Sequence, residues 1–216
     1  MKLLDAKYEI LTDIDSDEIM MNLGTYAGVC YKGNNSDPSL ETAKRVISNC
    51  IKNGHESVIE HEKITVKFFV DRGITHELVR HRLASFTQES TRYCNYSNDK
   101  FGNDVTFIDI HDIVHDCASY NEETCIAILN EWYKACEDSE RHYFKMLKLG
   151  ATPQIARSVL NNSTAATIVI TANLREWRTI LRLRTANNAH PQMIEVMRPL
   201  LKELKTKLPI IFDDIS

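Results

Sequence analysis

Glycine and proline are scarce in this chain, which has seven glycines and five prolines among 216 residues. The glycines form neither the Gly-x-Gly-x-x-Gly pattern of dinucleotide-binding folds nor the Gly-x-x-x-x-Gly-Lys pattern of phosphate-binding loops. A nucleotide bound here would therefore need side chains, not a glycine-rich backbone cradle, to hold its phosphates. No linker-like segment and no internal repeat occurs, so a single domain over residues 1–216 is expected.

Long apolar runs and closely paired cysteines are also missing. No uninterrupted apolar stretch approaches the ~18 residues of a membrane span. The first eight residues, Met-Lys-Leu-Leu-Asp-Ala-Lys-Tyr, lack the apolar run of a signal peptide. The six cysteines contain no Cys-x-x-Cys pair. These absences predict a cytoplasmic protein with free thiols and no membrane partner.

Lysine is absent from two windows that are rich in arginine. Residues 72–92 and 157–184 hold nine of the twelve arginines and none of the fourteen lysines, in a chain of net charge −4. A guanidinium offers a rigid fork of donors that matches two oxygens of a phosphate or carboxylate. Two local basic concentrations on an acidic chain favour a small polyanionic ligand over a long nucleic acid. The alternative for such a charged run is a solvated helix face.

Residue periodicity predicts an α+β fold, with helices around a small, mostly antiparallel sheet. Strands are expected at 3–11, 64–70, 105–110 and 163–172. Helices are expected at 17–31, 38–53, 74–84, 120–149, 153–160, 174–186 and 191–206, with a loop at 32–37. The segment over 80–93, Arg-His-Arg-Leu-Ala-Ser-Phe-Thr-Gln-Glu-Ser-Thr-Arg-Tyr, would then cross a helix end and the loop after it.

Arg184 occupies an unusual position on the predicted helix over 174–186. At about 100° per residue it falls within the apolar arc of that helix, whereas Arg175, Arg178 and Arg182 form a separate stripe that is solvated or faces a ligand. A buried guanidinium without a partner costs several kcal/mol. Arg184 therefore requires a partner, which is either an internal salt bridge or an anionic ligand.

Three further chemistries are compatible with single features of the sequence. Cys94 lies beside arginines that would lower its pKa and make it a nucleophile, and the alternative is an idle thiol. His111 and His115 have the spacing of a metal-dependent hydrolase, but no His-Glu-x-x-His occurs and no metal is expected. The aromatic residues near the arginines could stack on nucleic-acid bases, against which the net charge argues: Phe86, Tyr93 and Tyr96.

The pattern over residues 80–92 resembles the signature of the flavin-dependent thymidylate synthases, which is Arg-His-Arg, seven residues, then Ser. Further segments extend the resemblance in the same order: Gly54-His55-Glu56-Ser57, Ala156-Arg157, Asn173-Leu174-Arg175, Leu183-Arg184 and Ala189-His190-Pro191-Gln192. Several separate motifs in the family's order make a chance match implausible. The chain departs from the family at Thr87-Gln88, where many members have Asn-Glu, and at Glu77, where glutamine is common.

The resemblance implies a reaction, two bound molecules and an assembly. The family makes dTMP from dUMP with methylenetetrahydrofolate as carbon donor, reduced FAD as hydride donor and NADPH as reductant, in homotetramers with sites between subunits. By this resemblance FAD would contact Ser57, Arg80, His81, Arg82, Gln88, Asn173, Arg175 and His190. By the same resemblance dUMP would contact Glu77, Arg80, Gln88, Ser90, Thr91, Arg92, Arg157 and Arg184.

Arg184 is the expected catalytic residue. A cation near the O2/N3 edge of the pyrimidine stabilises the negative charge that develops when electron density moves toward C5, and a water-poor setting strengthens this effect. The implied reaction requires no enzyme cysteine, which agrees with an idle Cys94, and neither a metal, a nucleic acid nor a membrane is an expected partner.

Overall fold

The structure is a computed structural model that describes residues 1–30, 38–97 and 102–216. The loop predicted at 32–37 lies outside the described residues. The chain forms two compact units: unit 1 contains Met1–Lys7, Phe68–Arg80 and Thr87–Ile168, and unit 2 contains Tyr8–Lys67, His81–Phe86 and Val169–Ser216. The expectation of a single catalytic domain stays a prediction.

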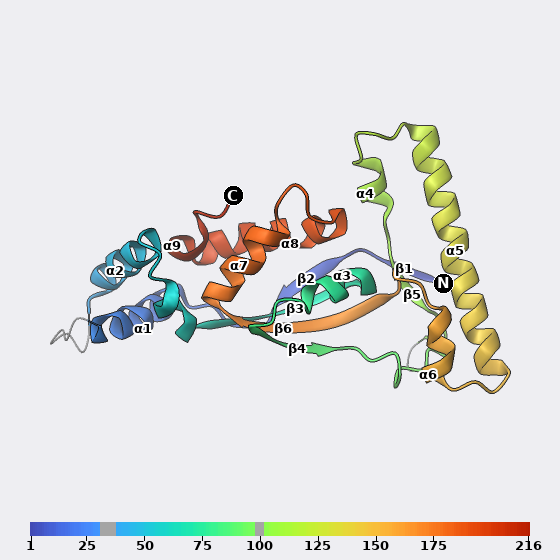
Figure 1. The fold of residues 1–216 in the computed structure, drawn as a ribbon, viewed down its shortest axis with the longest axis horizontal. Coiled ribbons are helices and arrows are strands. Elements are labelled where there is room, and N and C mark those ends of the chain that lie inside the picture. Colours follow the sequence, from blue (N-terminus) through green and yellow to red (C-terminus); the bar gives the residue numbers. More distant parts are fainter. Residues whose placement is uncertain (31–37, 98–101) are drawn as a thin grey trace. The chain divides into compact units, whose positions relative to one another are not determined.

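Helices and short strands alternate irregularly along the chain (Figure 1). In order they are β1 (Lys2–Leu4), β2 (Lys7–Ile10), α1 (Ser16–Val29), α2 (Leu40–Lys52), the 3-10 helix η1 (Glu56–His61), β3 (Lys63–Asp71), α3 (Arg72–Leu78), β4 (Ala84–Gln88), β5 (Thr106–Ile108), α4 (His111–His115), α5 (Glu122–Lys148), α6 (Pro153–Ala156), the 3-10 helix η3 (Arg157–Val159), β6 (Ala165–Asn173), α7 (Leu174–Arg184), α8 (Pro191–Lys207) and α9 (Pro209–Phe212).

The main sheet has four strands in the order β2-β3-β6-β4. Leu174 N donates to Glu62 O near one end of the β3–β6 pair, and Arg72 N donates to Thr164 O near the other. Each step forward along β3 is thus matched by a step backward along β6, so these two strands are antiparallel. β1 and β5 form a separate parallel pair. The predicted α+β class is confirmed.

Alternating burial explains why β3 forms. Ile64, Val66, Phe68 and Val70 have no exposed surface, whereas the residues between them are only partly buried. Because successive side chains of a strand point to opposite faces, this alternation places one face of β3 in the core. The same pattern runs along β6, where every second residue is buried. The strands predicted at 64–70 and 163–172 are therefore confirmed with small shifts at their ends.

Helix caps fix the ends of the elements that carry the arginines. Asp71 Oδ1 accepts from Ile74 N at 2.7 Å and starts α3, and Asn173 Oδ1 accepts from Glu176 N at 2.8 Å and starts α7. Each bond satisfies one of the backbone donors that a helix leaves unpaired at its N-terminus. Trp177 anchors α7 to the sheet, since its indole Nε1 donates to Ile64 O at 2.9 Å.

Two sequence-based predictions of local structure are wrong. The helix expected over 74–84 ends at Leu78, and Ala84–Gln88 instead forms strand β4. The arginine-rich segment therefore runs along a strand that joins the sheet beside β6, a pairing between distant parts of the chain that local periodicity does not reveal. The strand expected over 3–11 is divided into β1 and β2, which belong to different sheets. None of the described helices combines the length and apolarity that a membrane crossing demands.

Candidate functional site

Unit 1 holds an arginine that faces a hydroxyl group. Arg157 lies in η3, and its Nη1 donates to Thr91 Oγ1 at 3.2 Å. Thr91 is only 4% exposed, so its hydroxyl is a fixed acceptor. Among the described residues, neither Arg157 nor the exposed Arg92 forms an ion pair with a carboxylate. The positive charge of this turn is therefore not cancelled internally, which suits the binding of an external anion.

Glu89 holds the turn that carries these residues. Its backbone N donates to Thr167 O at 2.8 Å, and its side chain accepts from Thr167 N at 3.4 Å and from the Tyr96 hydroxyl at 3.1 Å. Burial, together with the Glu89 carboxylate, raises the pKa of Tyr96, so the phenol keeps its proton and remains the donor. The sequence analysis missed Glu89, because a single acidic residue between polar neighbours carries no periodic signal.

Gln88 departs from the family pattern and has a defined contact. Its Nε2 donates to Thr75 Oγ1 at 2.9 Å, and the Thr75 hydroxyl in turn donates to Arg72 O at 2.9 Å. Thr75 is fully buried in α3, so this bond ties the end of β4 to that helix. An ionised glutamate at position 88 would have to accept from the hydroxyl instead of donating to it. Its predicted contacts with FAD and dUMP stay predictions.

In unit 2 the predicted catalytic arginine contacts a buried histidine. Arg184 Nε donates to His81 Nε2 at 3.0 Å, and His81 is 7% exposed. Burial and the adjacent Arg184 charge lower the pKa of His81 to about 4. His81 is therefore neutral near pH 7, with Nε2 as acceptor and the proton on Nδ1. This neutral partner fixes the orientation of the guanidinium.

Glu176 lies behind this histidine but does not form a true salt bridge with it. Its Oε1 is 3.7 Å from His81 Nδ1, which is too long for a hydrogen bond, and the imidazole is neutral. Burial raises the pKa of the Glu176 carboxyl. Its position favours the Nδ1–H form of the imidazole, which leaves Nε2 to accept from Arg184.

Two of the predicted flavin residues are also helix caps. Asn173 uses its side-chain oxygen to cap α7, which leaves the amide NH₂ as a donor. His190 caps α8 through Nδ1, which accepts from Gln192 N at 3.3 Å, so its exposed ring places the proton on Nε2. Each side chain therefore keeps an N–H donor, while its accepting atom caps the start of a helix.

Ser57 and Arg175, both predicted to contact FAD, line one cavity of about 450 Å³ in unit 2. Arg175 Nη1 donates to Glu60 Oε1 at 2.5 Å, and Glu56 lies 3.9 Å from its Nε. The cavity thus combines an arginine fork held by carboxylates with a hydroxyl. Arg82 is exposed and belongs to the same unit. Arg80 and Glu77 belong to unit 1.

The stripe predicted for α7 is wrong at Arg178. This residue is 1% exposed and binds both oxygens of Asp214, at 2.6 and 2.7 Å, as well as Glu56 at 3.2 Å and the Ile211 carbonyl. Arg182 contacts Asp214 at 3.2 Å from the exposed side. These carboxylates come from η1 and from the segment after α9, so a helical projection of α7 alone does not foresee them.

The residues of the alternative cysteine and metal sites make ordinary local contacts. Cys94 is partly buried and packs against an apolar cluster that includes Tyr143 and Ala156. The rings of His111 and His115 lie 4.4 Å apart, and His111 Nδ1 contacts Asp112 at 2.9 Å. Within the described part of the chain, no group of three or more His, Cys, Asp or Glu side chains has the arrangement of a metal site.

A solved structure has the same fold. The UMP/dUMP methylase PolB from Streptomyces cacaoi, bound with 5-Br dUMP, matches with a TM-score of 0.81 and covers 99% of this chain and 96% of its own. The two sequences are 20% identical. The likeness therefore establishes the architecture, which supports the α+β assignment, but does not transfer ligand or activity.

Sequence comparisons agree on one family. The family model described as "Thymidylate synthase complementing protein" matches residues 13–210. The flavin-dependent thymidylate synthase of Pyrococcus abyssi is 34% identical over 152 residues, which cover 70% of this chain and 58% of that protein. The Corynebacterium glutamicum enzyme of the same name is 28% identical over 98% of this chain and 84% of its own length, and that of Mycobacterium sp. (strain JLS) is 30% identical over 88% and 78%. With the family model matching nearly the whole sequence, the chain belongs to the flavin-dependent thymidylate synthase family.

Proposed function

We propose that this protein is a flavin-dependent thymidylate synthase that converts dUMP to dTMP by reductive methylation. In this proposal methylenetetrahydrofolate gives the carbon, reduced FAD gives the hydride and NADPH reduces the flavin. The observation that carries the proposal is the contact between Arg184 and neutral His81, because it gives the expected catalytic arginine a fixed orientation.

The phosphate of dUMP is assigned to the turn in unit 1. Arg157 and Arg92 supply positive charge, and the hydroxyls of Ser90 and Thr91 supply polar contacts. Arg157 already has its guanidinium directed by Thr91, so part of its rotamer freedom is lost before the nucleotide arrives. The absence of an internal carboxylate partner for this arginine among the described residues supports this role.

Arg184 is assigned to the O2/N3 edge of the uracil. As electron density moves toward C5, negative charge grows at that edge, and a fixed cation stabilises it more in the transition state than in the ground state. A charge on His81 would push Arg184 away and compete for the same electron density. The low pKa of His81 prevents this at neutral pH.

FAD is assigned to residues of unit 2 that present oriented donors. When bound, the flavin supplies the hydride chemistry that no side chain can perform. Asn173 keeps its amide NH₂ and His190 its Nε2–H as donors, and Arg175 lines the cavity that it shares with Ser57. These donors fit the polar edge and the phosphates of the cofactor. His81, Arg82, Arg80 and Gln88 complete the proposed contacts by resemblance.

The folate co-substrate, the oligomeric assembly and the cellular compartment are also part of the proposal. We assign folate as a co-substrate, a homotetramer with shared sites as the assembly, and the cytoplasm as the compartment; these rest on family membership and on the thiol-rich composition. Nucleic acid and membrane are not assigned.

A spectrum and an assay test the proposal together. The purified protein is expected to be yellow with bound FAD, and to form dTMP from dUMP only when methylenetetrahydrofolate and NADPH are both present. His81→Ala with Arg82→Ala should reduce flavin content, and Lys145→Ala with Lys148→Ala on α5 should not. A protein that stays colourless after addition of FAD, or whose flavin content is unchanged in the His81/Arg82 variant, would contradict the assignment. UMP in place of dUMP tests whether the sugar hydroxyl is discriminated.

A further inference from the structure

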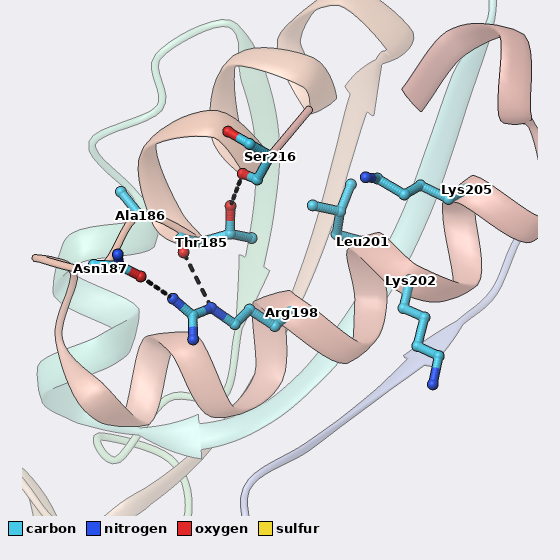
Figure 2. Close-up of a pocket in the computed structure, with 8 residues that line it drawn as sticks. All are labelled: Thr185, Ala186, Asn187, Arg198, Leu201, Lys202, Lys205 and Ser216. Atoms are coloured by element: carbon cyan, nitrogen blue, oxygen red, sulfur yellow. Dashed lines mark hydrogen bonds between the residues drawn. The ribbon is translucent and has the colours of Figure 1, made fainter. Parts of the chain in front are cut away.

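A second basic site lies on unit 2, and none of its lining residues is assigned above to flavin or nucleotide. Figure 2 shows a cleft of about 680 Å³ between the turn after α7 and one face of α8. Residues 185–187 form one side together with Ser216, whose backbone oxygen accepts from Thr185 Oγ1 at 3.5 Å, and α8 supplies the other side through Arg198, Leu201, Lys202 and Lys205. A volume of this size is typical of a small-molecule site.

Three cationic side chains line this cleft. Arg198, Lys202 and Lys205 stand three or four residues apart on α8, so they share one helix face. No Asp or Glu side chain lines the cleft. Over the described ranges, none of the three cations lies within ion-pair distance of a carboxylate. Because the rest of the chain is acidic, this concentration of unbalanced positive charge attracts anions locally.

Arg198 is already oriented at the inner end of the cleft. Its Nε donates to Thr185 O at 3.2 Å, and its Nη2 donates to Asn187 Oδ1 at 2.6 Å (Figure 2). Both acceptors are neutral, so the guanidinium keeps its charge, and its fork retains further N–H groups. A preorganised fork loses little freedom when it binds two phosphate oxygens.

The two lysines supply charge that can adapt. Lys205 extends toward Leu201 in Figure 2, whereas the exposed Lys202 extends away from the turn. A lysine ammonium is a compact charge on a flexible four-carbon stem, so both can turn toward a bound anion. Leu201, which is 6% exposed, lies beside the tip of Lys205 and adds an apolar contact to the lining (Figure 2).

We propose that this cleft binds a small phosphorylated anion with at least two negative charges. Arg198 would bind phosphate oxygens as a fork, and Lys202 and Lys205 would bind the remaining charge. The proposal does not depend on the function assigned above, since none of these residues belongs to the predicted dUMP or FAD contacts. It does predict an anion site in unit 2 in addition to the proposed dUMP phosphate site of unit 1 and the proposed FAD contacts.

Pyrophosphate is the probe that tests this site. Titration calorimetry at low ionic strength compares four proteins: wild type, Lys202→Gln with Lys205→Gln, Arg92→Gln, and the matched control Lys145→Gln with Lys148→Gln. The control removes two exposed lysines at the same spacing from α5 in unit 1. The cleft variant should weaken one binding event by at least about tenfold, because two charge-assisted contacts are lost. The control and Arg92→Gln should leave that event unchanged.

Three results would overturn the proposal. The first is that Arg92→Gln loses all of the pyrophosphate binding seen in wild type, because the anion would then bind only in unit 1. Another is equal weakening in the cleft and control variants, because the effect would then reflect total charge. The third is wild-type affinity in the cleft variant. Thermal melting of each protein confirms that the exposed substitutions leave the fold intact.

Discussion

Two arginine environments in this molecule differ in the partners that hold the guanidinium. In unit 1, Arg157 is directed by the hydroxyl of Thr91. In unit 2, Arg178 is enclosed by the carboxylates of Asp214 and Glu56. A neutral partner fixes an arginine and leaves its charge for a ligand, whereas a carboxylate partner uses that charge to stabilise the fold.

The two environments show that arginines from one lysine-free window need not share a role. Both arginines come from the same lysine-free window over 157–184, yet they belong to different units and have different roles. Arg184, close to Arg178 on α7, resembles Arg157 in having a neutral partner in His81. Arginine density alone therefore does not separate Arg178, which stabilises the fold, from Arg157 and Arg184.

The largest expected effect is on stability, at Arg178. Replacing Arg178 by Met removes a fully buried guanidinium that Glu56, 16% exposed, and Asp214, 49% exposed, share, which should lower the free energy of unfolding by about 3 kcal/mol. Arg182→Met is the matched control, because Arg182 contacts Asp214 from the exposed side and should cost under about 1 kcal/mol. Urea denaturation measures both. Equal losses would remove the distinction between the buried and the exposed arginine.

Arg184→Lys should lower kcat about 100-fold while the fold and flavin content stay intact. A point charge on a flexible stem cannot reproduce the guanidinium fork that His81 holds, and the lost interaction is one made mainly in the transition state. Steady-state kinetics with saturating folate and NADPH measure the change. Arg182→Lys, on the same helix but paired with a carboxylate, should keep its kcat. A near-normal kcat in Arg184→Lys would contradict the role given to this residue.

Acid should weaken the fold through His81. Its pKa is about 4 in the folded protein against an ordinary value of 6.5. Between these values the unfolded chain binds a proton at this residue and the folded chain does not, so stability is lost as the pH falls from about 6.5 to about 4. The loss should reach about 3 kcal/mol. His81→Asn, which still accepts from Arg184, should flatten the curve of unfolding free energy against pH; an unchanged slope would show that His81 is protonated in the fold.

Arg157→Lys should raise the KM for dUMP about tenfold and change kcat by less than about twofold. The phosphate is held equally in the ground state and the transition state, so weakening its contact affects binding rather than turnover. The measurement is a dUMP titration of initial rate. If Arg157→Lys lowered kcat and Arg184→Lys raised only KM, the two roles would be reversed.

The smallest effect is expected at Cys94. Cys94→Ala should keep near-normal dTMP formation, with a stability loss of about 1 kcal/mol from reduced packing against its apolar neighbours. The position beside Arg92 makes the opposite outcome plausible on charge alone. Complete loss of turnover in a folded, flavin-containing variant would restore covalent catalysis by this thiol.

The sequence predicted those helices and strands whose apolar residues recur with a regular period. The regular spacing of apolar residues located α2, α5, β3 and β6, because these elements bury one continuous face. Strand β4 was missed because its five residues pair with β6, far along the chain. Short elements such as α9 also have too few residues to show a period.

The residues of the candidate site also fall into two groups, those that a local pattern identified and those that it did not. The projection of α7 identified Arg184 as an arginine that needs a partner, and the structure supplies His81. The same projection failed for Arg178, because its partners are brought in from other segments. Glu89 and Glu176 were missed because their importance lies in contacts that only tertiary structure creates.

The capping roles of Asn173 and His190 have a consequence for the entropy of cofactor binding. Each side chain is already immobilised by a backbone N–H when its helix forms. Its rotamer freedom, worth about 0.5–1.5 kcal/mol per side chain, is therefore lost during folding and not during association. Asn173→Asp would keep the cap oxygen and remove the outward donor, so it separates the two roles of one residue. Helix formation in unit 2 thus orders these cofactor contacts before flavin binds. Ordering of the two side chains is therefore not a step in the association of flavin with the apoprotein.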